Sequence, residues 1–189
     1  QQSSLPMASD YTTVTKRALD TYDGIVAAIG ATASASMNAL FPSSATNTLS
    51  AQLKMVARMI EQQATFGMKR QVFMVGMGGF DLHDFLATQH PPLLQKLSSA
   101  MKEFDDAMNS LGKGPQVTSF TASDFGRTLT SNGDGSDHGW GSHHFVMGGA
   151  VNGGKFLGTA PEIGLTHNQQ VGSGRLLPST AVDQLGAEL

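Results

Sequence analysis

The sequence predicts an α/β fold in which a mainly parallel sheet is flanked by helices. Apolar residues recur at helical spacing in several stretches, and short continuous apolar runs lie between these stretches. A strand, a helix and a second strand in this order form a right-handed unit with parallel strands, because the connection is long enough for a crossover. The predicted α/β domain covers residues 49–189, and residues 1–48 form a helical and irregular lead-in.

The lead-in carries one stretch with helical spacing. Residues 9–29 predict a helix whose buried side consists of Val14, Leu19, Tyr22, Ile25 and Ile29. Residues 30–47 are small, polar and interrupted by proline, and this composition indicates a loop.

A steady apolar stripe predicts the next helix, which begins at Leu49 and ends before Gly67. Residues 71–76 (QVFMVG) then form a short apolar run between an arginine and several glycines. Its brevity and its valine and phenylalanine content are typical of a buried parallel strand.

The second half of the chain supplies the remaining elements. A helix opens at Pro91 and Pro92, because proline is tolerated in the first helical turn, and its apolar stripe ends at Leu111. Two further strands are predicted at residues 116–121 and 144–147. A last helix is expected to begin near residue 179.

The composition excludes several classes of protein. A net charge of −3 without any cluster of lysine and arginine argues against a nucleic-acid surface. The longest apolar runs fall short of the roughly 20 residues that cross a bilayer, so no membrane span is expected. The chain has no cysteine, which excludes disulfides and thiol catalysis and fits an oxidising compartment.

Candidate metal ligands gather beside the predicted strands. They are aspartate and histidine residues in three separate stretches: Asp81, His83, Asp124, Asp137 and His138. Ligands of open α/β sheets bind at the carboxyl ends of the strands, so we expect these side chains to share one cavity rim. Carboxylate and imidazole donors suit a divalent cation. Arg127 lies nearby, and its planar guanidinium suits an oxyanion such as phosphate or sulfate.

Each of these signals also has a structural explanation. An Asp-x-His sequence after a strand often forms a turn, and Asp124 could cap the segment that follows it. Residues 132–135 (NGDG) have the composition of a turn. His143 and His144 would point to opposite faces of a strand, so at most one of them would enter a site. The metal-site prediction therefore rests on convergence of the signals.

Three motifs resemble a bacterial family catalogued as domain of unknown function 1501. They are residues 52–84, residues 123–128 (SDFGRT) and residues 135–154 (GSDHGWGSHHFVMGGAVNGG). The resemblance covers the chain from about residue 49 onward. It implies an alkaline-phosphatase-like fold and export by the twin-arginine route to the periplasm or beyond. It also implies metal-dependent hydrolysis of a phosphate or sulfate ester, with an anionic small molecule as substrate.

The resemblance also implies roles for individual residues. Asp81 and His83 resemble the pair that binds the first metal, and His138 resembles the histidine that completes this site. Asp124 resembles a further ligand, whereas Asp137 would either ligate or orient His138. The cation would be zinc, calcium, magnesium or manganese.

Two departures from the pattern of these hydrolases favour an alternative. Phe125 stands where they carry a histidine, and residues 1–70 contain no strand followed by a nucleophile. The chain begins with Gln1 and is interpreted as the C-terminal part of a longer protein. The alternative is a non-catalytic exported protein that keeps the fold for binding or assembly. Trp140 would then stack on a sugar or partner, or be buried as a structural residue.

Overall fold

The core lies between two helices, α3 (Thr48–Glu61) and α4 (Leu86–Ser110), in the computed structural model, which describes residues 6–31 and 35–189. Apolar residues at helical spacing bring the buried side chains of both helices onto facing sides. The core consists of Met37, Phe41, Val56, Ala57, Ile60, Phe104, Ala107 and Met108. The predicted stripe from Leu49 is thus confirmed as α3, although the helix ends at Glu61 and so stops short of the predicted end just before Gly67.

A buried carboxylate ties α4 to the chain that precedes and opens α3. Glu103 accepts hydrogen bonds from the backbone N–H of Ser43 at 3.0 Å and from its hydroxyl at 2.9 Å, and a third from the hydroxyl of Ser50. Ser43 lies in the short 3-10 helix η1 (Pro42–Ala45), and Ser50 lies in the first turn of α3. These three hydrogen bonds replace the hydrogen bonds to water that the carboxylate loses when it is buried.

Asn47 starts α3 and connects it to α4. Its side-chain oxygen accepts from the backbone N–H of Leu49 at 3.2 Å, which satisfies one of the free donors at the helix N-terminus. Its side-chain nitrogen donates to the carbonyl of Lys96 at 2.8 Å. Asparagine therefore fixes both the first residue of α3 and its distance from α4.

Two antiparallel sheets stand where a parallel sheet is predicted. β1 (Thr118–Phe120) pairs with β4 (Val146–Gly148), and β2 (Gly126–Ser131) pairs with β3 (Ser136–Gly139). The prediction of a mainly parallel, alkaline-phosphatase-like α/β sheet is therefore wrong. The chain turns back at residues 132–135 in the β2–β3 hairpin, as their composition predicts. Later in the chain, β4 runs beside β1 in the opposite direction.

Residues 71–76, the predicted buried parallel strand, are extended but pair with no strand in the part of the chain that the structure describes. Phe73 and Val75 pack against the core, whereas Val72 and Met74 are 98% and 99% exposed. The backbone N–H and C=O of Gly76 are bonded by the side-chain amide of Gln52, at 3.0 and 2.8 Å. The backbone groups of Gly76 that could pair with a neighbouring strand are thus hydrogen-bonded to a side chain of α3.

The helix predicted to open at Pro91 begins earlier, at Leu86, and contains Pro91 and Pro92. The backbone N–H of Leu86 donates to the carbonyl of Asp134 at 3.0 Å, so the hairpin holds the first turn of α4. Phe85, the residue before the helix, has a left-handed backbone with φ of 54°. The helix therefore begins before its prolines, at a residue that contacts the hairpin.

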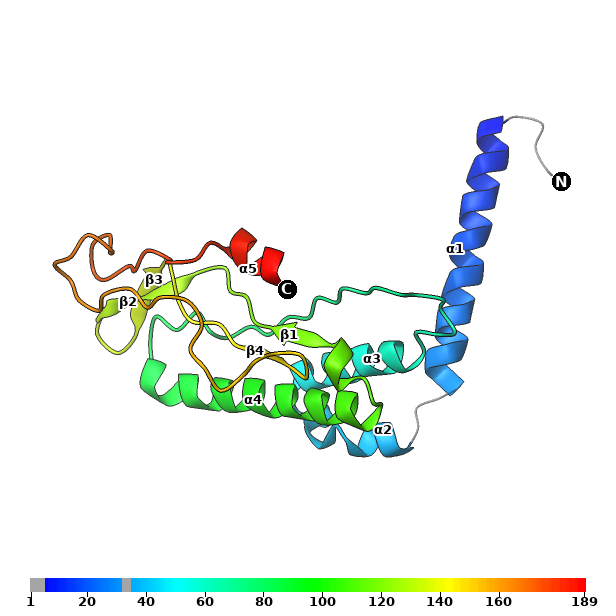
Figure 1. The fold of residues 1–189 in the computed structure, drawn as a ribbon, viewed down its shortest axis with the longest axis horizontal. Coiled ribbons are helices and arrows are strands. Elements are labelled where there is room, and N and C mark those ends of the chain that lie inside the picture. The colour runs from blue at the N-terminus through cyan, green and yellow to red at the C-terminus, as the bar shows by residue number, and fades with distance from the viewer. Residues whose placement is uncertain (1–5, 32–34) are drawn as a thin grey trace.

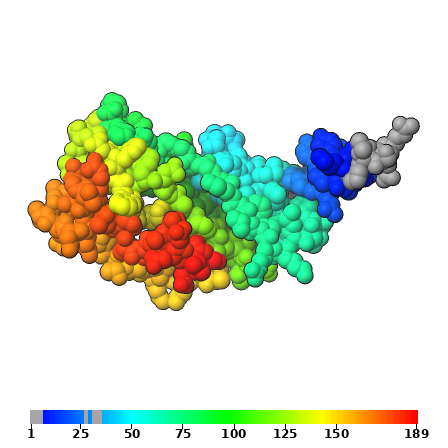
Figure 2. Space-filling view, turned by 90° about the horizontal axis from the view of Figure 1, so that it is seen from above, coloured from blue at the N-terminus to red at the C-terminus, as the bar shows by residue number. Residues whose placement is uncertain are grey.

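The remaining helices lie at the two ends of the chain. The helix predicted at residues 9–29 is α1 (Pro6–Ala31), but Val14, Leu19 and Tyr22 of its predicted buried side are exposed, since α1 projects from the body (Figures 1 and 2). The predicted loop at residues 30–47 contains α2 (Ala35–Ala39) and η1, and its residues 32–34 lie outside the described residues. The last predicted helix is α5 (Val182–Glu188).

The short 3-10 helix η2 (Gly114–Gln116) leads from α4 into β1. In Figure 1 the β2–β3 hairpin lies near the N-terminal end of α4, and β1 and β4 lie farther along the same helix. Within the described residues, no helix has the length and apolar character needed to cross a bilayer.

Replacing Glu103 by alanine should destabilise the fold by about 3 kcal/mol, because the amide of Ser43 and the hydroxyl of Ser50 lose their buried acceptor. Urea unfolding followed by circular dichroism measures this change. Asp106→Ala on the same helix is the matched control, since it removes only an exposed pair with Lys102. Equal stability of the two variants would contradict the assigned role of Glu103.

Candidate metal centre

The loop before α4 is fastened to the β2–β3 hairpin through its backbone. The carbonyl of Leu82 accepts from the N–H of Ser136 at 3.4 Å, and the side chain of Leu82 is buried. Asp81 and His83, on either side of this buried leucine, are exposed beside the hairpin. The Asp-Leu-His sequence therefore presents two polar groups there.

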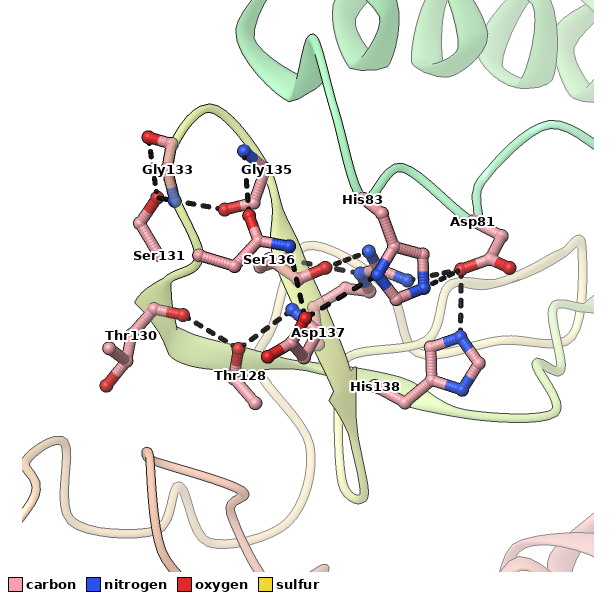
Figure 3. A network of polar contacts seen from close by, with 12 residues as sticks. Asp81, His83, Thr128, Thr130, Ser131, Gly133, Gly135, Ser136, Asp137 and His138 are labelled. Carbon is pink, nitrogen blue, oxygen red and sulfur yellow. Dashed lines mark hydrogen bonds and ion pairs between the residues drawn. The ribbon is translucent and has the colours of Figure 1, made fainter.

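Asp81, His83 and His138 meet at one point (Figure 3). The Nε2 atoms of His83 and His138 lie 3.0 and 2.9 Å from Oδ1 of Asp81. One donor atom from each residue lies within 4.8 Å of the others. About half of each side chain is exposed, so ions from solvent can reach the group.

Arg127 neutralises the same carboxylate from β2. Its Nη1 donates to Oδ1 of Asp81 at 2.7 Å, its Nε donates to Oγ of Ser136 at 3.1 Å, and its Nη2 donates to the carbonyl of Ser136. Arg127 is the register partner of His138 in the hairpin, so β2 and β3 deliver both side chains to Asp81. The residue predicted to bind an anion therefore lies at the site with its guanidinium engaged.

Asp137 lies behind His83. Its Oδ1 is 3.5 Å from Nδ1 of His83 (Figure 3). The same oxygen accepts from the side-chain amide of Asn132 at 3.1 Å. The carboxylate thus faces the ring nitrogen that does not contact Asp81. The sequence prediction allowed Asp137 to ligate or to orient His138, whereas the structure places it next to His83.

The other candidates differ in position. Asp124 is exposed just before β2 and lies outside the group of donor atoms that converge at Asp81. The imidazole of His144 lies on the β1–β4 side, where its Nδ1 is 3.4 Å from the hydroxyl of Thr121. Among the five predicted metal ligands, the structure therefore brings together three donors and adds Asp137 behind one of them.

Sequence reasoning missed the contact made by Phe125. Its ring stacks on the imidazole of His138, with 3.9 Å between ring centroids and 12° between planes. The guanidinium carbon of Arg127 lies 5.7 Å from the centroid of the same ring. The period of two in extended chain puts residues 125 and 127 on one face, and this pattern was the available signal.

Hydrogen bonding shifts the acidity of Asp81. The pKa of this carboxyl lies below its ordinary value of 3.8, chiefly because Arg127 hydrogen-bonds to it and next because His138 does. Desolvation acts in the opposite direction and is outweighed. The carboxylate is therefore ionised at neutral pH, which a metal ligand requires.

Two imidazole nitrogens and a carboxylate oxygen form a donor set typical of zinc and related divalent ions. The set fits a cation chemically, because a neutral imidazole offers a lone pair on a ring nitrogen, and the Nε2 atoms of both rings face Oδ1 of Asp81. The orienting contact of Asp137 to the other nitrogen of His83 is also usual for histidine ligands.

The model for the family described as "Protein of unknown function (DUF1501)" matches residues 2–189. The chain therefore belongs to this family. Comparisons with curated proteins and with solved structures each gave no match.

Replacing Gly135 by alanine should displace the loop that carries Asp81 and His83. A Cβ at this position would lie 2.1 Å from the carbonyl oxygen of His83, which is backbone and cannot rotate away. Histidine NMR signals should move, and the melting temperature should fall. Gly78→Ala is the matched control, because a Cβ there meets no atom within 4 Å. Unchanged spectra in Gly135→Ala would contradict the close approach.

Acid should weaken the contact between loop and hairpin. The pKa of Asp81 is lowered in the folded protein, so its stabilising contribution is complete above the ordinary value of 3.8 and is lost as pH falls through the lowered pKa. Urea unfolding below about pH 4 should therefore show a shallower pH dependence for Asp81→Asn than for the unchanged protein. Asp124→Asn serves as the control and should keep the steeper dependence.

Proposed function

We propose that Asp81, His83 and His138 bind one divalent transition-metal ion and that the site hydrolyses anionic esters. The observation that carries the proposal is the convergence of three donor atoms within 4.8 Å of one another. These donors come from two segments far apart in the chain, which are held together by backbone hydrogen bonds.

The donor types favour zinc among the divalent ions. Zinc accepts nitrogen and oxygen donors in a tetrahedral arrangement, and catalytic zinc sites use three protein ligands with one open position. Calcium and magnesium prefer sites built from oxygen atoms alone. Three donors, of which two are imidazole nitrogens, therefore favour a zinc-like ion with room for a substrate or water.

The surroundings support an anionic ester as substrate. A divalent ion polarises an ester oxygen and lowers the pKa of the water that it binds. Such an ion would therefore activate both reactants of a hydrolysis, the ester and the water. Arg127 offsets the negative charge of Asp81 through its ion pair with that carboxylate, so that a bound divalent ion would leave the site with an excess of positive charge. This charge favours phosphate or sulfate esters over neutral ones.

A second candidate is cation-dependent binding of an anion without turnover. Two hydroxyls of the hairpin that carries His138 are already engaged: Ser136 Oγ accepts from Arg127, and Thr128 Oγ1 donates to the carbonyl of Thr130 at 2.8 Å. Both residues are buried. A covalent route through a serine or threonine is therefore not favoured, and turnover would depend on water.

We also propose that the protein is exported by the twin-arginine route. The absence of cysteine from the chain fits an oxidising compartment, where exposed thiols would be oxidised. Fractionation of cells that express the full-length gene tests this part of the proposal.

Calorimetric titration with Zn²⁺ tests the cation site. The protein should bind about one equivalent, and Asp81→Asn, His83→Ala and His138→Ala should each weaken binding by at least about tenfold. His143→Ala is the matched control, since this exposed histidine lies outside the group of donors. Binding of less than about half an equivalent, or equal binding by all four variants, would contradict the proposal.

Turnover separates the two candidate functions. With Zn²⁺ bound, hydrolysis of p-nitrophenyl phosphate or p-nitrophenyl sulfate that is lost in His138→Ala supports the hydrolase. Zinc binding and anion binding without any turnover would support the non-catalytic alternative.

A further inference from the structure

We propose that Phe125 is a positioning residue of the cation site: its stacked ring fixes the plane of the His138 imidazole so that Nε2 faces Asp81. The two rings lie 3.9 Å apart with 12° between their planes, and Nε2 lies 2.9 Å from Oδ1 of Asp81. This inference rests on the proposed function, because it concerns how the same site holds its ion.

His138 needs such a constraint because the rest of its surroundings are open. Half of its side chain is exposed, and its ring meets that of His83 only in a tilted contact, with 5.0 Å between centroids. Rotation of an imidazole about its last side-chain torsion meets only broad, shallow energy wells. A ring stacked on one face of the imidazole opposes this rotation, because the rotation would tilt the imidazole out of its parallel contact with Phe125.

The hairpin brings Phe125 and His138 together. Gly126 and Gly139, which follow these two residues, are register partners in β2 and β3. A Cβ at Gly126 would lie 2.6 Å from the carbonyl oxygen of Gly141, and one at Gly139 would lie 2.5 Å from that of Arg127. Only glycine permits this close approach of the strands, which places the two rings face to face.

The electronic character of the ring favours the cation-loaded site. The face of an aromatic ring carries negative potential and attracts cationic groups. An imidazole that donates its lone pair to a divalent ion gains positive character. Phe125 therefore stabilises His138 more with an ion bound than without one, and its ring also lies 5.7 Å from the guanidinium of Arg127.

Cobalt binding by the full chain tests the inference, because Co²⁺ reports its coordination geometry through visible absorption. Phe125→Leu should bind Co²⁺ about fivefold more weakly than the unchanged protein, with shifted absorption bands. Phe125→Tyr keeps the aromatic face and should restore both the affinity and the spectrum. Phe120→Leu, at a half-exposed phenylalanine of β1, is the matched control and should leave both unchanged.

Histidine NMR of the metal-free protein adds a readout that a general loss of stability would not give. The ring protons of His138 should be shifted upfield by the stacked ring, and this shift should disappear in Phe125→Leu and persist in Phe125→Tyr. Phe125→Met provides a second non-aromatic variant of similar volume if Phe125→Leu does not fold.

The outcomes distinguish this inference from the proposed function. If the unchanged protein binds no Co²⁺ or Zn²⁺, the cation site itself is absent and both statements are overturned. If it binds Co²⁺ and the leucine and methionine variants bind it with the same affinity and spectrum, only the role of Phe125 is overturned.

Discussion

The Oδ1 atom of Asp81 is the point at which the loop before α4 meets the β2–β3 hairpin. Arg127 and His138 approach it from adjacent strands, and His83 approaches it from its own loop. The backbone supports this contact through the bond from Ser136 to Leu82. Without this carboxylate, the guanidinium and the two imidazoles would lose the oxygen that they share, so the arrangement of these three side chains depends on one atom.

Two carboxylates join segments of this chain, and burial separates their roles. Glu103 accepts bonds from Ser43 and Ser50 inside the core, where no ion from solvent reaches it. Asp81 makes its contacts at the surface, with about half of its side chain exposed. The buried group therefore acts as a structural link, whereas the exposed group can exchange its protein donors for a cation.

The helices could be predicted from the sequence and the sheet could not. Helical spacing is a local property, so the stripe beginning at Leu49 predicts the start of α3, although the helix ends earlier than predicted. Strand pairing depends on segments far apart in the chain, and the apolar run at residues 71–76 contains no sign that Gln52 would occupy the backbone of Gly76. Even the boundary of α4 is set by a distant contact with Asp134.

The sequence predicts part of the candidate site, although through a different sheet. Asp81, His83 and His138 converge through an antiparallel hairpin and not through the ends of parallel strands. Asp124 lies outside the group because the alternation of extended chain selects residues 125 and 127 for the face that meets His138. The extended segment at residues 71–76 has a chemical consequence of its own. Met74 is almost fully exposed to solvent, whereas Met37 and Met108 are buried in the core. An oxidant would therefore convert the thioether of Met74 to its sulfoxide before it reaches these two core methionines.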